Sequence, residues 1–268
     1  MFVNRELYKN RMELVIIQAI LYICHGSRVG KASQEAIDFV RKTMSLVDAP
    51  VQEYCFLELA SPTILEGVDQ CVKRGATNIA VVPVLLLTAT HAKKDIPDVL
   101  DHAKKEYPNV NFSYGSPLGV QEQMIDVLVE RLTEKCKVTP DMQVLLVGRG
   151  SSDPDAIKDI NKIASLLQER IDVSSVNTCF LAAARPKFEE MLRSTAAFGA
   201  ERIVILPYLL FTGVLMTDIE RFVDQLYINP EQEIMICDYL GDHTNVTQLL
   251  RNRVEEAIEE GEKIATMA

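Results

Sequence analysis

The sequence predicts an α/β protein made of two similar lobes from a tandem duplication, each a parallel sheet flanked by helices. Two observations support this fold class. Short runs rich in Val, Ile and Leu alternate along the 268 residues with segments of helical periodicity, which is typical of parallel α/β domains. The whole pattern then occurs a second time, in the same order, after about residue 138, which indicates an internal repeat.

The first half contains four strands and four helices in alternation. Apolar strands are expected to end at Cys24, to span 51–57 and 79–87, and to cover 110–114. Helices are expected near 33–44, 61–72, 95–105 and 120–135. Ser33 and Ser61 are the expected N-caps of the first two helices, and Pro62 suits a first helical turn.

The second half repeats the first at one constant offset. Four separate segments have a counterpart 124 residues later: His25-Gly26-Ser27 with Arg149-Gly150-Ser151, Cys55-Phe56-Leu57 with Cys179-Phe180-Leu181, Gly75-Ala76 with Gly199-Ala200, and Pro83 with Pro207. Chance does not keep one offset across four segments. We place the joint near Lys137 to Pro140, with an N-terminal lobe at 1–137 and a C-terminal lobe at 138–268.

The composition is that of a globular protein with a formal net charge of −10, 48% hydrophobic and 25% charged residues. The negative charge argues against nucleic acid and anionic membranes as partners. No signal-peptide layout opens the chain, and the apolar stretch at 14–24 is too short to span a bilayer. The six cysteines form no C-x-x-C pair, which is typical of free thiols in a reducing compartment. We therefore expect a cytoplasmic protein, with a frayed arm at residues 1–11.

Three polar residues stand immediately after expected strands. His25 follows the first strand, Glu58 the second, and His91 lies just beyond the third. In open α/β sheets, ligands bind at the carboxyl ends of the strands. Two imidazoles and a carboxylate there could hold a divalent ion such as Fe²⁺, Co²⁺, Ni²⁺ or Zn²⁺, or could accept protons near neutral pH.

The repeat tests these three residues internally. The second half keeps the surrounding scaffold but places other residue types at the three positions: Arg149 for His25, Ala182 for Glu58, and Val214 or Leu215 for His91. A purely structural group should be needed in both copies, so this loss favours a function in the first half. A lone histidine is more often structural. His102, on an exposed helix, is read that way, while His243, in a loop, could be structural or could line a cleft.

Basic residues gather at the same expected sheet edges. Arg28, Lys93 and Lys94 lie beside the histidines, and Arg149 and Arg185 occupy the matching edge of the second half. Each alone reads as solvated surface charge, but together they would attract a polycarboxylate despite the negative net charge. The segment 148–153 lacks the lysine and spacing of a Walker motif, so nucleotide binding is not expected.

Four motifs resemble the sirohydrochlorin chelatases, the class II, ATP-independent metal-inserting enzymes, over about residues 15–255. They are His25-Gly26-Ser27-Arg28, Phe56-Leu57-Glu58, the run from Pro83 to Pro97, and the run from Gly148 to Asp155. The resemblance is greatest to the siroheme-pathway ferrochelatases of Bacillus-type bacteria. The chain ends without a His-rich tail or a cluster-binding cysteine motif, which favours iron over cobalt.

The resemblance implies two lobes that face each other across a cleft. It implies that His25, Glu58 and His91 bind Fe²⁺, with Co²⁺ or Ni²⁺ also possible, and that His25 and His91 act in catalysis. The ion would be inserted into sirohydrochlorin with release of two protons and without ATP or a redox cofactor. The ring's carboxylates would be bound by a polar set: Ser27, Arg28, Lys93, Lys94, Arg149 and Arg185.

Three alternatives remain open at this stage. The enzyme could insert cobalt into the same ring, or the protein could carry a metal or tetrapyrrole without turnover. A protoporphyrin ferrochelatase would need an apolar cleft, and the basic residues and the absence of tryptophan argue against it. Because the duplication removes the need for a homodimer, we expect a monomer.

Overall fold

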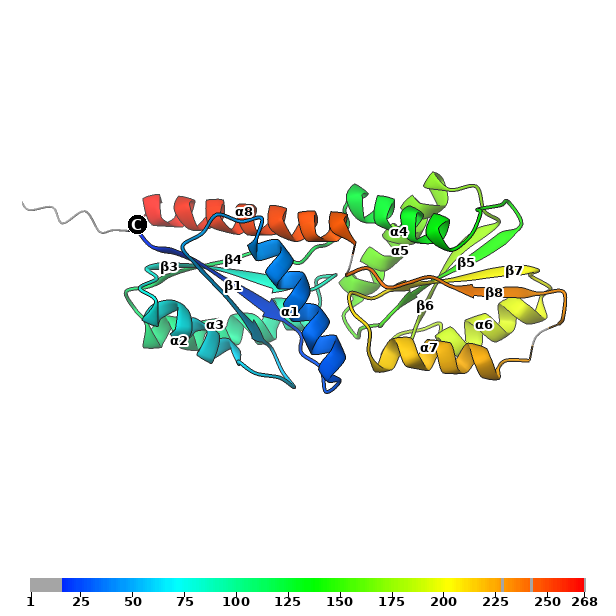
Figure 1. Ribbon diagram of the computed structural model, residues 1–268, viewed down its shortest axis with the longest axis horizontal. Helices are drawn as coiled ribbons and strands as arrows, with labels where there is room; N and C mark the ends of the chain where they lie inside the picture. Colours follow the sequence, from blue (N-terminus) through cyan, green and yellow to red (C-terminus); the bar gives the residue numbers. More distant parts are fainter. Residues whose placement is uncertain (1–15, 228, 242, 268) are drawn as a thin grey trace, which may run out of the picture.

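Two parallel sheets lie side by side along the long axis of the computed structural model, which describes residues 16–227, 229–241 and 243–267 (Figure 1). The arm expected at residues 1–11 lies outside these ranges. The first sheet has the order β2-β1-β3-β4 and the second has the order β6-β5-β7-β8. All pairs in both sheets are parallel. The two sheets therefore share one topology, as expected of a duplication.

The four strands of each sheet alternate with helices along the chain. The first half comprises β1 (Gln18–Cys24), α1 (Gly30–Met44), β2 (Val51–Phe56), α2 (Ile64–Lys73), β3 (Asn78–Val84), the π-helix η1 (His91–Asp95), α3 (Ile96–Glu106), β4 (Asn111–Tyr114) and α4 (Glu122–Lys135). The second half comprises β5 (Met142–Gly148), α5 (Pro154–Arg170), β6 (Ser175–Phe180), α6 (Phe188–Ala197), β7 (Arg202–Tyr208), α7 (Val214–Gln225), β8 (Glu233–Ile236) and α8 (Thr244–Met267).

Two expected helix caps are wrong. Helix α1 begins three residues before Ser33, whose hydroxyl instead donates a hydrogen bond to the backbone carbonyl of Ser27. Helix α2 is capped by Thr63, which forms a reciprocal capping box with Glu66. The Thr63–Glu66 spacing satisfies two backbone N–H groups at once, so it prevails over the single serine at position 61.

The last helix of each half lies against the sheet of the other half. Helix α8 packs on strands β3 and β4 of the first sheet and on helix α1. Helix α4 packs on strand β7 of the second sheet and on helix α5 (Figure 1). One contact that fixes α8 is the buried hydrogen bond from the Ser113 hydroxyl of β4 to the carbonyl of Ala257. The division at residues 137 and 138 stays a prediction about where the sequence repeat is joined.

One hydrophobic core runs through both lobes. It continues from the face of the first sheet under α1 and α8 to the face of the second sheet under α4 and α5. Separate clusters lie on the opposite faces, under α2 and α3 in the first sheet and under α6 and α7 in the second. Strands with helices on both faces explain why the strand sequences are continuously apolar.

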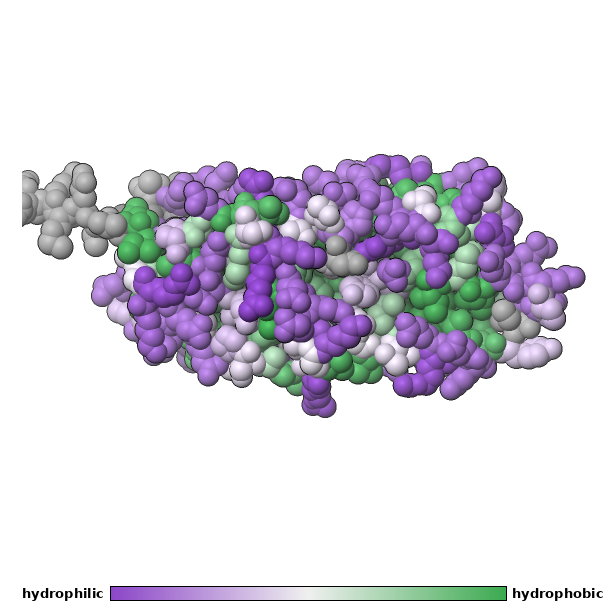
Figure 2. All heavy atoms as spheres, viewed as in Figure 1, coloured by the Kyte–Doolittle hydropathy of each residue, from purple (hydrophilic) through white to green (hydrophobic). Residues whose placement is uncertain are grey.

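The outer surface is mostly hydrophilic on the face seen in Figure 2, with scattered patches of hydrophobic residues. Within the described ranges, no helix is both long and apolar enough to cross a membrane.

Candidate active site

His25 and Glu58 are brought together by the extension of the β1–β2 ladder beyond both strands. The backbone N–H of Glu58 donates to the carbonyl of His25 at 3.1 Å, one residue after the matching bond from Leu57 to Cys24. Gly26 has a φ of +94°, and a Cβ there would stand 1.8 Å from the carbonyl oxygen of Glu58. Only glycine therefore allows the loop after β1 to pass so close to Glu58.

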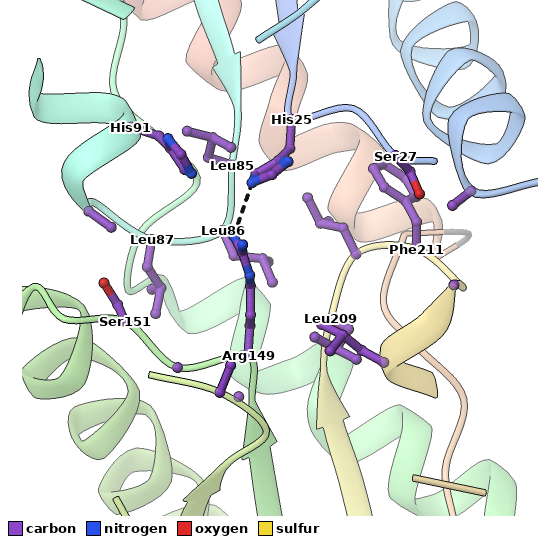
Figure 3. Close-up of a pocket in the computed structure, with 18 of the residues that line it drawn as sticks. His25, Ser27, Leu85, Leu86, Leu87, His91, Arg149, Ser151, Leu209 and Phe211 are labelled. Atoms are coloured by element: carbon purple, nitrogen blue, oxygen red, sulfur yellow. Dashed lines mark hydrogen bonds between the residues drawn. The ribbon is translucent and has the colours of Figure 1, made fainter. Parts of the chain in front are cut away.

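His91 faces His25 from the next loop of the same sheet edge. It is the first residue of η1, and its Nδ1 lies 2.7 Å from Oδ2 of Asp95, one turn later. The two imidazole rings meet edge to face, with centroids 4.8 Å apart and an interplanar angle of 88°. Figure 3 shows both rings pointing into the same space.

The three residues expected to bind metal form one cluster. One possible ligand atom from each of His25, Glu58 and His91 lies within 4.8 Å of the others. The Nε2 of His25 is 3.6 Å from Oε1 of Glu58. Two imidazoles and one carboxylate with solvent access form an open donor set that suits a divalent first-row ion and leaves room for a further ligand.

Hydrogen bonding favours a neutral His25 with its proton on Nδ1. That nitrogen lies 3.2 Å from the carbonyl oxygen of Gly26, and Nε2 accepts a hydrogen bond from Nη1 of Arg149 at 3.0 Å. Burial lowers the pKa of His25 below its usual range, and the charges of Arg149 and His91 lower it further, against opposing contributions from the Gly26 carbonyl and Glu58. The neutral imidazole keeps the Nε2 lone pair that a metal ion needs.

A cavity of about 820 Å³ opens beside the cluster and is lined by both halves of the chain. Its size lies within the range of roughly 300–1,000 Å³ that small-molecule pockets occupy. Much of its wall comes from corresponding apolar segments after β3 and β7: Leu85, Leu86, Leu87, Leu209, Leu210 and Phe211. The expectation that the cleft is not apolar is therefore wrong, and it no longer argues against protoporphyrin.

The basic residues expected around the substrate fall into two groups. Arg28 and Arg149 line the cavity. Lys94 is exposed, and Arg185 pairs with Glu190 at 3.0 Å, and neither residue lines the cavity.

Lys93 also lies outside the cavity wall and spans the two lobes. It binds Asp153 at 2.8 Å and Asp155 at 2.6 Å, at the start of α5. These two carboxylates raise the pKa of Lys93. The lysine is therefore already engaged by carboxylates of the protein.

Ser27 lines the cavity, but its hydroxyl also shapes the loop. It accepts a hydrogen bond from the backbone N–H of Val29 at 3.0 Å. Its counterpart Ser151 accepts the same bond from Asp153 at 3.0 Å. Because both copies of the repeat keep this contact, it supports the loop in the half that lacks the histidines as well.

The two remaining histidines lie apart from this cluster. His102 is exposed on α3, as expected. His243 does not line the cavity, and its Nε2 lies 2.7 Å from Oε2 of Glu130 on α4. The structure shows a contact between His243 and Glu130 that links α4 to the start of α8, and His243 also lines a second pocket, which does not include the two histidines of the cluster.

Asp95 is the residue of the site that sequence reasoning missed. It holds Nδ1 of His91, so that Nε2 of His91 is free to face the cleft. The signal was present in the sequence, because residues four apart on a helix share a face. The comparison of the two halves did not single out Asp95, because the second half also has an aspartate, Asp218, at the corresponding position. That aspartate has no histidine four residues before it.

Comparison with known proteins places the chain. The family model CbiX matches it twice, at residues 19–135 and 143–257. The chain belongs to the CbiX family. The double match agrees with the duplication, because each match covers one of the two repeated halves of the chain.

Relatives with similar full lengths are known in this family. The chain is 45% identical to "Sirohydrochlorin ferrochelatase" of Priestia megaterium over 91% of both chains. It is 39% identical to "Sirohydrochlorin cobaltochelatase" of the same species, over 91% of this chain and 81% of the relative. The solved structure "SirB from Bacillus subtilis with Fe3+" superposes with a TM-score of 0.84 at 45% identity, covering 92% of this chain and 98% of that one.

Proposed function

We propose that this CbiX-family chain is a sirohydrochlorin ferrochelatase, which inserts Fe²⁺ into sirohydrochlorin to give siroheme and releases two protons. The observation that carries the proposal is the meeting of His25, Glu58 and His91 beside a cavity of about 820 Å³. The identity to a ferrochelatase over most of both chains supports the choice of substrate.

His25, Glu58 and His91 hold the ion at the edge of the first sheet while the ring enters the cleft. The planar apolar parts of the ring contact the leucine segments after β3 and β7, which exclude water from its faces. Ion and ring are then held in register, which converts a bimolecular encounter into a step within one complex.

Transfer of the ion frees the bases that the reaction needs. As the ion leaves the two imidazoles and the carboxylate for the four ring nitrogens, two pyrrole N–H protons must depart. His25 and His91 regain their lone pairs in the same step and accept these protons. Charge balances, because one divalent cation enters the ring as two protons leave it.

The rest of the predicted polar set stays part of the proposal. Arg28 and Arg149 line the cavity and bind ring carboxylates by charge-assisted hydrogen bonds. Ser27, Lys93, Lys94 and Arg185 contribute less, since the serine and Lys93 already have partners within the protein and Lys94 and Arg185 lie outside the cavity wall. We also propose a monomer that works in the cytoplasm without a nucleic-acid or membrane partner, in keeping with the net charge of −10.

The test is anaerobic metal insertion into sirohydrochlorin, followed by absorbance, with Fe²⁺ and Co²⁺ compared. His25→Ala and His91→Ala should each lower the rate by about 100-fold or more, while His102→Ala on the exposed face of α3 should not. Circular dichroism confirms that each variant is folded. Insertion that survives both active-site substitutions would place the chemistry elsewhere, and a wild-type rate equal to the uncatalysed rate would remove the enzyme claim.

Cobalt insertion is the second candidate, because the cobaltochelatase relative is also similar over most of its length. Nitrogen and oxygen donors bind Co²⁺ more tightly than Fe²⁺, so metal affinity alone does not decide between them. The ratio of kcat/KM for the two ions, in the same assay, does.

A further inference from the structure

Arg149 forms a hydrogen bond with Nε2 of His25, the nitrogen that would bind a metal ion. It lies in the loop after β5 and reaches across the cleft, where its Nη1 donates a hydrogen bond to His25 Nε2 at 3.0 Å. Figure 3 shows the guanidinium end directed at the His25 ring from the second half. The only lone pair on Nε2 cannot accept this hydrogen bond and bind an ion at the same time.

Arg149 has no competing partner that would hold it elsewhere. Among the residues the structure describes, no ion pair includes Arg149, although Glu58 lies 3.6 Å from the same His25 nitrogen. Its positively charged side chain lines the cavity. A fixed positive charge at this point opposes a divalent cation as well as blocking its ligand.

We propose that Arg149 is a displaceable blocker of the metal site, which is drawn away from His25 by a carboxylate of the tetrapyrrole. Metal and tetrapyrrole then bind cooperatively, because each favours the arrangement in which Arg149 has left the imidazole. The inference deepens the proposed function and rests on it, since it takes His25 as a metal ligand and a polycarboxylate ring as the substrate.

The exchange of partners is favourable on chemical grounds. A guanidinium pairs with a carboxylate through two parallel charge-assisted hydrogen bonds, whereas a neutral imidazole offers one acceptor. The open cavity lets a ring carboxylate reach the side chain. By linkage, whatever factor the ring adds to metal affinity, the metal adds to ring affinity.

The first test measures Co²⁺ binding to the metal-free protein by visible absorption, in wild type, Arg149→Gln and Arg41→Gln. The last is a charge-matched control near the end of α1 whose side chain does not line the cavity. Loss of the blocking hydrogen bond should tighten Co²⁺ binding by Arg149→Gln about five- to tenfold. The control should bind as wild type does. Unchanged or weaker binding by Arg149→Gln overturns the proposal.

The second test adds zinc uroporphyrin, an octacarboxylate ring whose centre is already filled. It should tighten Co²⁺ binding by the wild type about fivefold or more, and it should leave the affinity of Arg149→Gln unchanged. Equal tightening in both proteins would show that Arg149 does not couple the two ligands, and would overturn the proposal.

The experiments give different results if the proposal for Arg149 is wrong than if the proposed chelatase function is wrong. If His25→Ala binds Co²⁺ as tightly as wild type, His25 is not a ligand and the proposed function loses its metal site. If His25→Ala loses Co²⁺ and wild type inserts metal, while Arg149→Gln leaves Co²⁺ affinity unchanged, only the blocker is wrong.

Discussion

Both histidines of the site have their Nδ1 atom engaged by an oxygen of the protein. His25 directs Nδ1 to the carbonyl of Gly26, and His91 directs Nδ1 to the carboxylate of Asp95. In each case the partner fixes the tautomer and turns Nε2 toward the cleft. The carboxylate of Asp95 also makes His91 a stronger donor to a cation than an imidazole bound to a carbonyl.

Replacing Asp95 should separate this positioning role from a structural one. Asp95→Ala should weaken Co²⁺ binding by about 10- to 100-fold, because His91 loses both its orientation and a basic partner. Asp95→Asn keeps an oxygen that can accept from Nδ1–H, so it should recover part of the loss. Co²⁺ titration measures both, with Asp98→Ala, on the exposed side of the first turn of α3, as control. A loss of thermal stability with unchanged affinity would make Asp95 structural.

The sequence predicts which residues form the candidate metal site but not the hydrogen-bond partners of those residues. His25, Glu58 and His91 could be found because strand ends converge at one sheet edge and because the second half lacks all three. The contact between Arg149 and His25 could not be found, since it depends on how the two lobes are placed. The same holds for Lys93, which reads as a free surface charge until Asp153 is seen opposite it.

The order of the elements could be predicted, but the place of two helices could not. The amphipathic pattern of α4 and α8 shows that each has a buried face, and it carries no information about which sheet covers that face. The duplication suggests that each half packs its own last helix. The structure shows the reverse, because α8 covers β3 and β4 while α4 covers the second sheet.

Lys93 joins η1 to the start of α5 across the cleft, and Lys94 beside it provides a matched comparison. Lys93→Met should increase amide hydrogen exchange at residues 88–95 and 151–156, because it removes the ion pairs with Asp153 and Asp155 that hold these segments together. Lys94→Met, at an exposed position, should leave exchange at the wild-type level. Identical exchange in the two variants would show that the ion pairs do not restrain the lobes.

At the scale of the whole molecule, buried thiols link stability to pH. Burial raises the pKa of Cys24, Cys71 and Cys179 to about 12 in each case. In the unfolded chain a thiol ionises near pH 8.5. Between these values the folded protein keeps protons that the unfolded chain releases, so the free energy of unfolding falls as pH rises.

Stability should therefore be constant from neutral pH to about pH 8 and should decline above it, by up to about 1.4 kcal/mol per pH unit for each buried thiol. Urea unfolding at pH 7, 9 and 10 measures the slope, and Cys71→Ala should make it shallower. A free energy of unfolding that does not change up to pH 10 would contradict the raised pKa values of the buried thiols.

His25 and Arg149 occupy equivalent positions of the repeat and touch each other. In a symmetric pair of half-length chains, position 25 would meet its own copy across the cleft, and any change there would appear on both walls. Joining the halves in one polypeptide removes that constraint. One wall of the cleft can then keep imidazoles that suit a cation, while the other wall carries a guanidinium that suits anions.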